Sequence, residues 1–182
     1  AGRGSLAGPV TASAVILPKG YKNKYLNDSK KITPKRREIL REVIEKDAIA
    51  YSIISISSEI IDRNNILNAT FIAMNSALEK LKIQPKFIIV DGNRFNNHLD
   101  IPYRCIVKGD QKYLNIAAAS ILAKTYRDNI MKELHLNYPI YKWDKNKGYG
   151  TLHHRESIIK YGRTKFHRKT YKLKEEQLKL KI

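Results

Sequence analysis

Two aspartates follow short segments of strand-forming residues, a placement that suits the binding of a divalent metal ion. Asp91 comes directly after the apolar run 87–90, and Asp110 comes shortly after the segment 104–107. Carboxylate oxygens are the ligands that hard cations such as Mg²⁺ prefer. A lone Asp before a glycine is more often a turn residue, and Asp110 has a second interpretation as the N-cap of the following helix. The two aspartates together favour a metal site.

The other acids and the histidines give weaker signals. Asp128 belongs to a helical stretch, where we interpret it as a structural partner of Arg127 or Lys124 in preference to a third catalytic acid. His153 and His154 are adjacent, so on a helix their side chains point in different directions and make a poor chelate. No spacing of cysteines and histidines resembles a zinc site. The sequence therefore favours a hard cation held by carboxylates.

Two glycine-framed motifs suit contact with a nucleic-acid backbone. In Gly2-Arg3-Gly4 the glycines allow the chain to approach a ligand closely, and the arginine offers a planar fork of donors to phosphate. In Gly148-Tyr149-Gly150 the ring can stack on a sugar or base, and its hydroxyl can bond a ribose. The alternative for Tyr149 is an ordinary surface tyrosine in a loop.

Positive charge dominates the composition and indicates a polyanionic partner. The chain has 35 Lys and Arg against 17 Asp and Glu, a net charge of +18 at pH 7, and its segment 163–182 is strongly basic. Nucleic acid is the commonest such partner, so a noncatalytic RNA- or DNA-binding protein is an alternative to an enzyme. No apolar run is long enough to span a bilayer, and we expect no membrane contact. Cys105 is the single cysteine, which fits a reducing compartment such as the cytoplasm.

Periodicity and capping signals predict an α/β protein with a single domain over residues 1–182. Thr33 and Pro34 form a helix start of a familiar kind. The predicted strands are 10–17, 48–57, 87–90 and 104–107, and the predicted helices begin at 34, 66, 116 and 153, with a short turn capped by Ser58 and a stop at Gly162. Active residues of α/β sheets gather past the carboxyl ends of strands, which is where Asp91 and Asp110 stand.

The chain resembles the bacterial ribonuclease HII family over essentially its whole length. The motifs that carry the resemblance are, in the family's order, Ala1-Gly2-Arg3-Gly4, Leu26-Asn27-Asp28-Ser29-Lys30-Lys31, Val90-Asp91-Gly92-Asn93, Lys108-Gly109-Asp110, the helix 117–124, Lys147-Gly148-Tyr149-Gly150-Thr151 and His167-Arg168. Each motif is weak alone, and their common order makes the resemblance specific.

The resemblance implies a ribonuclease H-like fold, with a mixed β-sheet flanked by α-helices and a helical C-terminal region. It implies an endonuclease that cleaves the RNA strand of RNA–DNA hybrids and nicks DNA at single embedded ribonucleotides. The reaction would be metal-assisted phosphodiester hydrolysis that leaves 5′-phosphate and 3′-hydroxyl ends. We expect such a protein to act as a monomer.

The resemblance also assigns roles to particular residues. Asp91 and Asp110 match two of the four carboxylates with which the family holds Mg²⁺ or Mn²⁺. The residues assigned to substrate binding are Gly2, Arg3, Gly4, Lys30 and Tyr149. The glycine-arginine motif would recognise the ribonucleotide 5′ of an RNA–DNA junction, and the tyrosine would lie against the sugar at that junction.

The chain also departs from the family's pattern. The other two family carboxylates are an Asp-Glu pair directly before the position of Ala1, in a first strand at the centre of the sheet. We expect such residues upstream of Ala1, and without them we expect poor folding and no activity. The sister family, ribonuclease HIII, is a second alternative, but it carries a lysine where Arg3 stands and an additional N-terminal domain.

Overall fold

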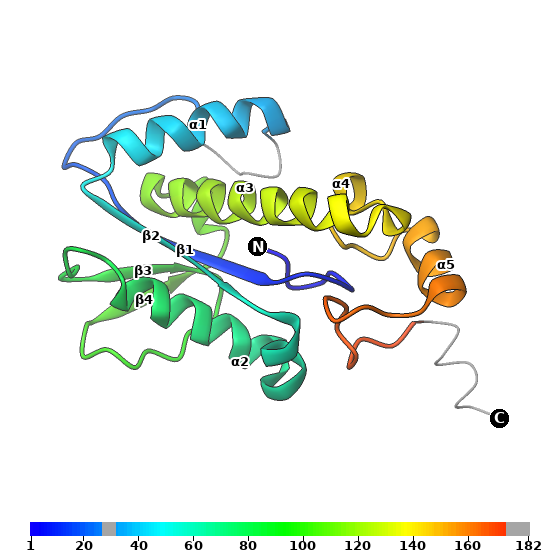
Figure 1. The fold of residues 1–182 in the computed structure, drawn as a ribbon. Helices are drawn as coiled ribbons and strands as arrows, with labels where there is room; N and C mark the ends of the chain where they lie inside the picture. Colours follow the sequence, from blue (N-terminus) through cyan, green and yellow to red (C-terminus); the bar gives the residue numbers. More distant parts are fainter. Residues whose placement is uncertain (27–31, 174–182) are drawn as a thin grey trace.

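Helices cover both faces of four short strands in the computed structural model, which describes residues 1–26 and 32–173 (Figure 1). The elements are, in chain order, β1 (Val10–Ile16), α1 (Pro34–Asp47), β2 (Ala50–Ile56), α2 (Ser58–Glu79), β3 (Ile88–Asp91), β4 (Tyr103–Ile106), η1 (Gly109–Gln111), α3 (Leu114–Asn137), η2 (Pro139–Tyr141), α4 (Trp143–Asn146) and α5 (Leu152–Tyr161). The labels η1 and η2 denote single turns of 3₁₀ helix. The predicted α/β class and the helical C-terminal region are confirmed.

β1 is covered on both faces, which explains its nearly continuous apolar sequence. On one face Val10 joins a core with Ala69 and Ala73 of α2. On the other face Ser13 donates a hydrogen bond to the carbonyl of Ala119 in α3, at 2.9 Å. The alanines of these two helices allow both to pack closely on the strand, so β1 forms the middle layer between α2 and α3.

The strands pair in two separate ladders among the described residues. β1 and β2 are antiparallel, with Val10 opposite Ile56, and β3 and β4 are parallel, with Asp91 opposite Ile106. Both strand directions occur, as expected for a mixed β-sheet, and among the described residues they are divided between these two ladders. On its edge away from β2, β1 is bonded near its start by Ala1, whose carbonyl accepts the Thr11 N–H at 3.0 Å.

α2 is longer than the sequence indicated. Its N-cap is Ser57, one residue before the predicted cap, and the helix continues past residue 66 to residue 79. Asn65 interrupts it with a φ of 63°, a left-handed conformation that asparagine tolerates better than most residues. The Asn65 side chain then accepts the N–H of Asn68 at 3.0 Å and caps the second half. The predicted helix start at 66 is this second start.

The segment between β4 and α3 settles one open interpretation of Asp110. α3 has Tyr113 at its N-cap, so Asp110 is not the cap of that helix and lies instead in the preceding turn η1. A Cβ atom at Gly109 would come within 2.6 Å of the Ile116 Cδ1 atom. The glycine therefore allows this turn to pack directly on the first turn of α3.

A second core ties the C-terminal helices to α3 and to the start of the chain. Trp143 and Tyr141 are buried and stacked, with ring centroids 5.1 Å apart. Met131 of α3, Ile158 of α5 and Ala7 belong to the same cluster. The first residues of the chain and its C-terminal part are therefore packed against each other, as Figure 1 shows.

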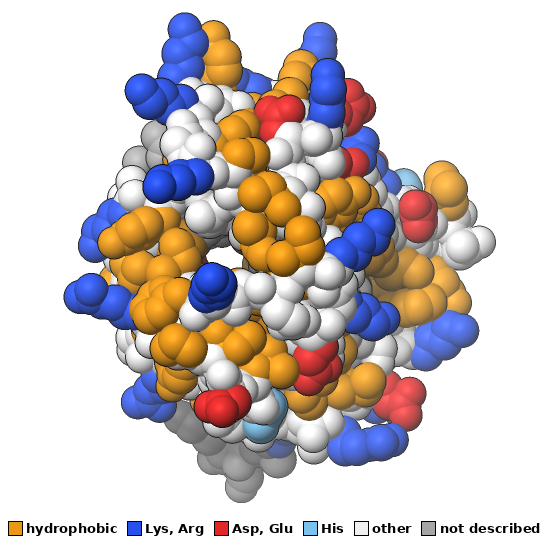
Figure 2. Space-filling model, turned by 90° about the vertical axis from the view of Figure 1, so that its left-hand side faces the viewer, with side chains coloured by type: hydrophobic (Ala, Val, Ile, Leu, Met, Phe, Trp, Pro, Cys, Tyr) orange, Lys and Arg blue, Asp and Glu red, His pale blue; other side chains and the backbone are white. Residues whose placement is uncertain are grey.

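Positive charge is spread over the face of the molecule that Figure 2 shows. Figure 2 shows one end of the molecule, where Lys and Arg side chains outnumber Asp and Glu side chains and alternate with hydrophobic ones. The charge therefore forms a general electrostatic background on this face, without a single basic patch. Within residues 1–26 and 32–173, none of the helices combines the length and the apolar character needed to cross a membrane.

Candidate active site

Asp91 and the turn that carries Asp110 are in direct contact. The Asp91 Oδ1 atom accepts a hydrogen bond from the N–H of Gly109 at 2.9 Å. The parallel ladder continues one step further, since the N–H of Gly92 donates to the carbonyl of Ile106 at 3.0 Å. Parallel strands present their carboxyl ends at the same edge, so β3 and β4 bring these two segments together. Asp91 is exposed there, and Asp110 is half-buried.

The donor set of this edge fits a hard divalent cation. Asp91 and Asp110 contribute carboxylate oxygens, and the described residues hold no group of three or more His, Cys, Asp or Glu side chains that could bind a metal. Mg²⁺ is commonly bound by one or two carboxylates together with waters and the phosphates of a substrate. An exposed carboxylate beside a backbone turn leaves room for both, so the pair suits an ion that the substrate helps to hold.

The N-terminal loop, defined as residues 2–9, presents open backbone at one point and buried backbone at another. Gly2 is buried with a φ of +83°, and a Cβ atom there would overlap the side chain of Arg127. Gly4 is exposed, and a Cβ atom there would meet nothing within 4 Å. Arg3 between them is also exposed. The backbone around Gly4 is therefore accessible to a large ligand, while Gly2 fixes the turn beneath it.

The tyrosine loop, defined as residues 147–151, lies directly against the N-terminal loop. The carbonyl of Gly148 accepts the N–H groups of Leu6 at 2.8 Å and of Ala7 at 3.2 Å. Gly148 has a φ of +81°, and a Cβ atom there would overlap the Ala7 carbonyl. Tyr149 follows, with 41% of its surface exposed. The structure thus brings the glycine-arginine motif and the tyrosine together, whereas Lys30 lies outside the described residues.

Arg168 holds the N-terminal loop from the C-terminal side, a role that the sequence did not reveal. Its guanidinium is fully buried and donates to the carbonyls of Gly2 at 2.6 Å, Arg3 at 2.8 Å and Gly8 at 3.0 Å. Burial lowers the pKa of this arginine, and the nearby Tyr171 opposes that shift. The residues joined here are far apart in the chain, and carbonyl acceptors exist at every position, so no residue pattern could have indicated the contact.

Two buried histidines support the tyrosine loop from the protein interior. The His154 Nδ1 atom lies 2.9 Å from the Tyr149 carbonyl, and its Nε2 atom accepts the indole N–H of Trp143 at 3.0 Å. The His167 Nε2 atom lies 3.2 Å from the same His154 Nε2 atom, and the His167 Nδ1 atom accepts the N–H of Thr164 at 2.9 Å. When both rings are neutral, with the proton on Nδ1 of His154 and on Nε2 of His167, every contact joins a donor to an acceptor, and the single lone pair of His154 Nε2 is shared between the Trp143 and His167 N–H groups.

The electrostatics of the two histidines agree with this assignment. Burial lowers the pKa of His154, an effect larger than the opposing bond to Tyr149. Burial, reinforced by the neighbouring His154, lowers the pKa of His167 to about 3. Both rings are therefore neutral at physiological pH, and their role is to hold backbone in place rather than to transfer protons.

Asp128 is an internal ion-pair residue, in line with the structural interpretation. It is buried and pairs with Arg37 at 3.2 Å and with Lys124. Desolvation lowers the pKa of Lys124, and the bond to Asp128 opposes this. Of the two partners proposed from the sequence, Lys124 is the one bonded to it, because Arg127 makes its hydrogen bonds to backbone carbonyls and to a serine instead.

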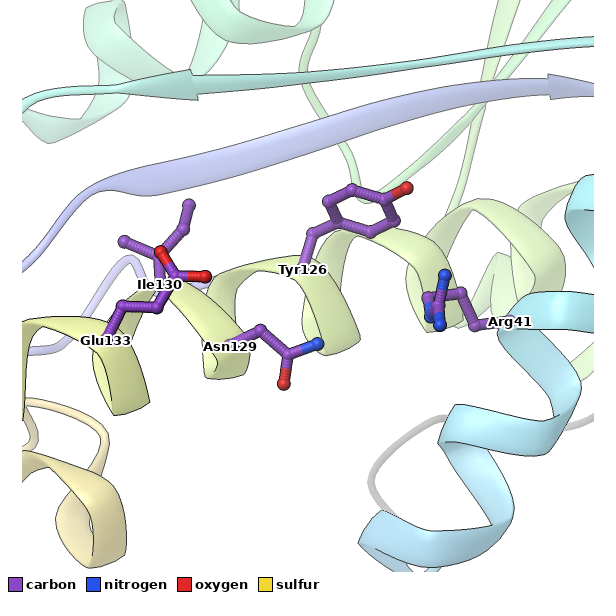
Figure 3. Close-up of a pocket in the computed structure, with 5 residues that line it drawn as sticks. All are labelled: Arg41, Tyr126, Asn129, Ile130 and Glu133. Atoms are coloured by element: carbon purple, nitrogen blue, oxygen red, sulfur yellow. The ribbon is translucent and has the colours of Figure 1, made fainter.

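A hollow between α1 and α3 lies apart from the predicted site residues. Its volume is about 240 Å³, and the five residues that line it are Arg41, Tyr126, Asn129, Ile130 and Glu133 (Figure 3). None of the residues predicted to contact metal or substrate is among them. Its lining is mixed in charge and carries no convergent set of groups, so it does not change the assignment of the site.

The fold is of the ribonuclease H type. Ribonuclease H2 from Pyrococcus horikoshii OT3 superposes with a TM-score of 0.81 over 100% of this chain and 95% of that chain, at 24% identity. Bst-RNase HIII in complex with Mn²⁺ superposes with a TM-score of 0.76 over 99% of this chain and 67% of that chain, at 16% identity. At these identities the likeness shows the fold.

The sequence model of the ribonuclease HII family matches residues 1–174, and the chain belongs to that family. Ribonuclease HII from Christiangramia forsetii is 57% identical over 180 residues, which cover 99% of this chain and 91% of that protein. The chain is accordingly an endonuclease of the ribonuclease H type. The alternative of a noncatalytic binding protein is wrong, and the family match also decides against ribonuclease HIII.

Proposed function

We propose that Asp91 and Asp110 hold divalent ions, Mg²⁺ or Mn²⁺, at the carboxyl edge of β3 and β4. The single observation that carries this proposal is the bond from the Gly109 N–H to Asp91, which fixes one carboxylate beside the residue that precedes the other. Bst-RNase HIII, which shares the fold, was solved in complex with Mn²⁺. Ions bound there would supply an activated water and stabilise the charge on the leaving 3′-oxygen.

The chain's own residues do the remaining work of binding and orientation. Asp91 keeps one carboxylate oxygen on the Gly109 N–H, which sets the direction of the other toward solvent and substrate. Because one oxygen is held by this hydrogen bond, the Asp91 side chain is oriented before the substrate binds. Preorganised ligands of this kind lower the reorganisation needed during the reaction.

The substrates we propose are the RNA strand of RNA–DNA hybrids and DNA duplexes with single embedded ribonucleotides, cleaved to 5′-phosphate and 3′-hydroxyl ends. Distinguishing RNA from DNA requires contact with a 2′-hydroxyl. The accessible backbone at Gly4 and the half-exposed Tyr149 lie on loops that are hydrogen-bonded to each other. We propose that these two groups, with Arg3 and Lys30 on the flanking phosphates, contact one ribose.

Cleavage of three matched duplexes tests this function. The duplexes share one sequence and contain a continuous RNA strand, a single ribonucleotide, or DNA alone. We expect cleavage of the first two only, dependent on Mg²⁺ or Mn²⁺ and abolished by a chelator, with end groups identified by mass spectrometry. Cleavage that survives the chelator would contradict the metal proposal. Equal cleavage of the all-DNA duplex would contradict the proposed recognition of ribose.

A further inference from the structure

We propose that Arg127 is a positioning residue that fixes the N-terminal loop and the tyrosine loop as one ribose-contacting surface. The inference rests on the proposed function and extends it to a residue that touches neither metal nor substrate. Arg127 is only 1% exposed and projects from the middle of α3. Every hydrogen bond that it makes among the described residues reaches one of these two loops.

Three of the four bonds hold the N-terminal loop. The Nε atom donates to the Pro9 carbonyl at 2.8 Å, and the Nη2 atom donates to the Ser5 hydroxyl at 2.7 Å and to the Ala7 carbonyl at 3.2 Å. Ser5 in turn donates to the carbonyl of Gly2 at 3.1 Å. The hold of Arg127 is thereby transmitted to the backbone that precedes Arg3 and Gly4.

The fourth bond and the arginine's flat face hold the tyrosine loop. The Nη1 atom donates to the Lys147 carbonyl at 3.0 Å. The Cζ atom lies 5.7 Å from the centre of the Tyr149 ring, within range of a cation–π contact. One guanidinium therefore sets the distance between the backbone of the first loop and the ring of the second.

The chemistry of these bonds requires arginine. A guanidinium offers five N–H groups in a rigid plane, whereas a lysine ammonium offers three donors at a single point and cannot span acceptors on two loops. The acceptors are carbonyls and a hydroxyl, in contrast with the buried Arg37, which is paired with Asp128. A charge buried without a carboxylate in its hydrogen bonds is costly. The hydrogen bonds by which Arg127 holds the two loops offset that cost.

Arg168 serves as an internal contrast. It also donates to carbonyls of the N-terminal loop, but it approaches from the C-terminal segment and bonds Gly2, Arg3 and Gly8. It stiffens one loop, whereas Arg127 bridges both. Loss of Arg127 should therefore change the geometry between the loops, and with it the discrimination between ribose and deoxyribose, beyond any general loss of stability.

The test measures discrimination by binding, so that it does not depend on turnover. With the full chain and EDTA present, fluorescence anisotropy gives affinities for a duplex with one ribonucleotide and for the same sequence in DNA. We expect the parent to prefer the ribonucleotide duplex and Arg127→Lys to lose at least fivefold of that preference. The control Arg41→Lys makes the same change on α1, where Arg41 pairs with Glu38 and Glu45, and should keep the preference. An Arg127→Lys preference within twofold of the parent's would overturn the inference.

A milder variant covers the case in which Arg127→Lys does not fold, as judged by circular dichroism. Ser5→Ala removes one acceptor of Arg127 and the bond to Gly2, and it should reduce the preference two- to threefold. An unchanged preference in Ser5→Ala, with Arg127→Lys unfolded, would overturn the inference and leave the proposed function intact. A parent that shows no preference at all would contradict the proposed function itself, and the inference with it.

Discussion

The Asp91 carboxylate accepts the N–H of Gly109 at 2.9 Å, so the end of β3 is tied to the turn that carries Asp110. This one bond joins two segments that lie 18 residues apart in the chain. It uses one of the two carboxylate oxygens and leaves the other for the metal role proposed above, and it stabilises the turn independently of any ion. Asp91 therefore contributes to the turn as a hydrogen-bond acceptor and to the proposed metal site as a negative charge. A substitution that keeps the acceptor and removes the charge tests the two contributions separately.

Asp91→Asn should keep the fold and lose the catalytic function. The asparagine Oδ1 atom can still accept the Gly109 N–H, but the neutral amide is a poor ligand for a hard cation. We expect cleavage to fall more than about 100-fold, which corresponds to about 2.7 kcal/mol of transition-state stabilisation. Calorimetric titration with Mn²⁺ should show weakened binding, while circular dichroism stays unchanged. Mg²⁺-dependent turnover comparable with the parent's would contradict the assignment.

Asp110→Asn should slow cleavage more than it weakens substrate binding. Asp110 sits in η1 and does not cap α3, so its replacement should leave the helix start intact. Hybrid affinity should stay within a few-fold of the parent's, while the cleavage rate falls as for Asp91→Asn. Thermal unfolding is the control. A variant whose main defect is a lower melting temperature, with a near-normal rate when folded, would show that Asp110 is structural.

Tyr149 should matter mainly through its ring. Stacking of an aromatic ring on a nucleotide contributes roughly 1–3 kcal/mol, so Tyr149→Ala should weaken the interaction with substrate by that amount. Tyr149→Phe keeps the ring and its contact with Arg127. It should lose only the proposed hydrogen bond from the tyrosine hydroxyl to the ribose. On the duplex with one ribonucleotide, we expect activity to fall from the parent to Tyr149→Phe and further to Tyr149→Ala. Equal activity of parent and Tyr149→Ala on that duplex and on a long hybrid would leave Tyr149 an ordinary surface residue.

Local signals predicted most of the elements correctly. α1 begins at Pro34 because Thr33 accepts the N–H of Arg36, a bond that the sequence alone indicated. α5 stops at Gly162, whose φ of 82° ends the helix. These features depend on residues within four positions of each other. The arrangement of strands into two ladders depends on distant pairing, and local patterns could not predict it.

The candidate site likewise contains residues that local sequence patterns predicted and residues whose contacts are distant in the chain. Asp91 and Asp110 stood out because a residue type coincided with strand ends, and Tyr149 because glycines framed it. Arg127 appeared in the sequence as a possible partner of Asp128, and Arg168 as part of a family motif. Their hold on the loops was not predictable, because most of their acceptors are backbone carbonyls, some of them 120 and 160 residues away. Every residue has a backbone carbonyl, so residue types do not show which carbonyl will accept a hydrogen bond. Buried arginines that hold backbone are therefore visible only in three dimensions.

Stability should fall below pH 6.5 because His167 is buried as a neutral ring with a pKa lowered to about 3. Between these two values the unfolded chain binds a proton at this position and the folded chain does not. The free energy of unfolding therefore decreases as the pH falls, by at most about 1.4 kcal/mol per pH unit for one such group. The lowered pKa of His154 acts in the same direction. Urea unfolding at pH 7.5, 6, 5 and 4 measures the slope.

The variant His167→Gln separates this effect from other titrations. Glutamine can still donate toward His154 but does not titrate, so the variant should be less stable at pH 7.5 and show a shallower decline between pH 6.5 and 4. Asp62 affects stability in a different pH range from His167. Burial raises the pKa of Asp62, but hydrogen bonds from Thr170 and Lys169 outweigh this effect and lower the pKa in sum. A lowered carboxyl pKa stabilises above the ordinary value of 3.8 and loses that contribution only as the pH falls further. Equal slopes for parent and His167→Gln above pH 4 would show that His167 does not control acid stability.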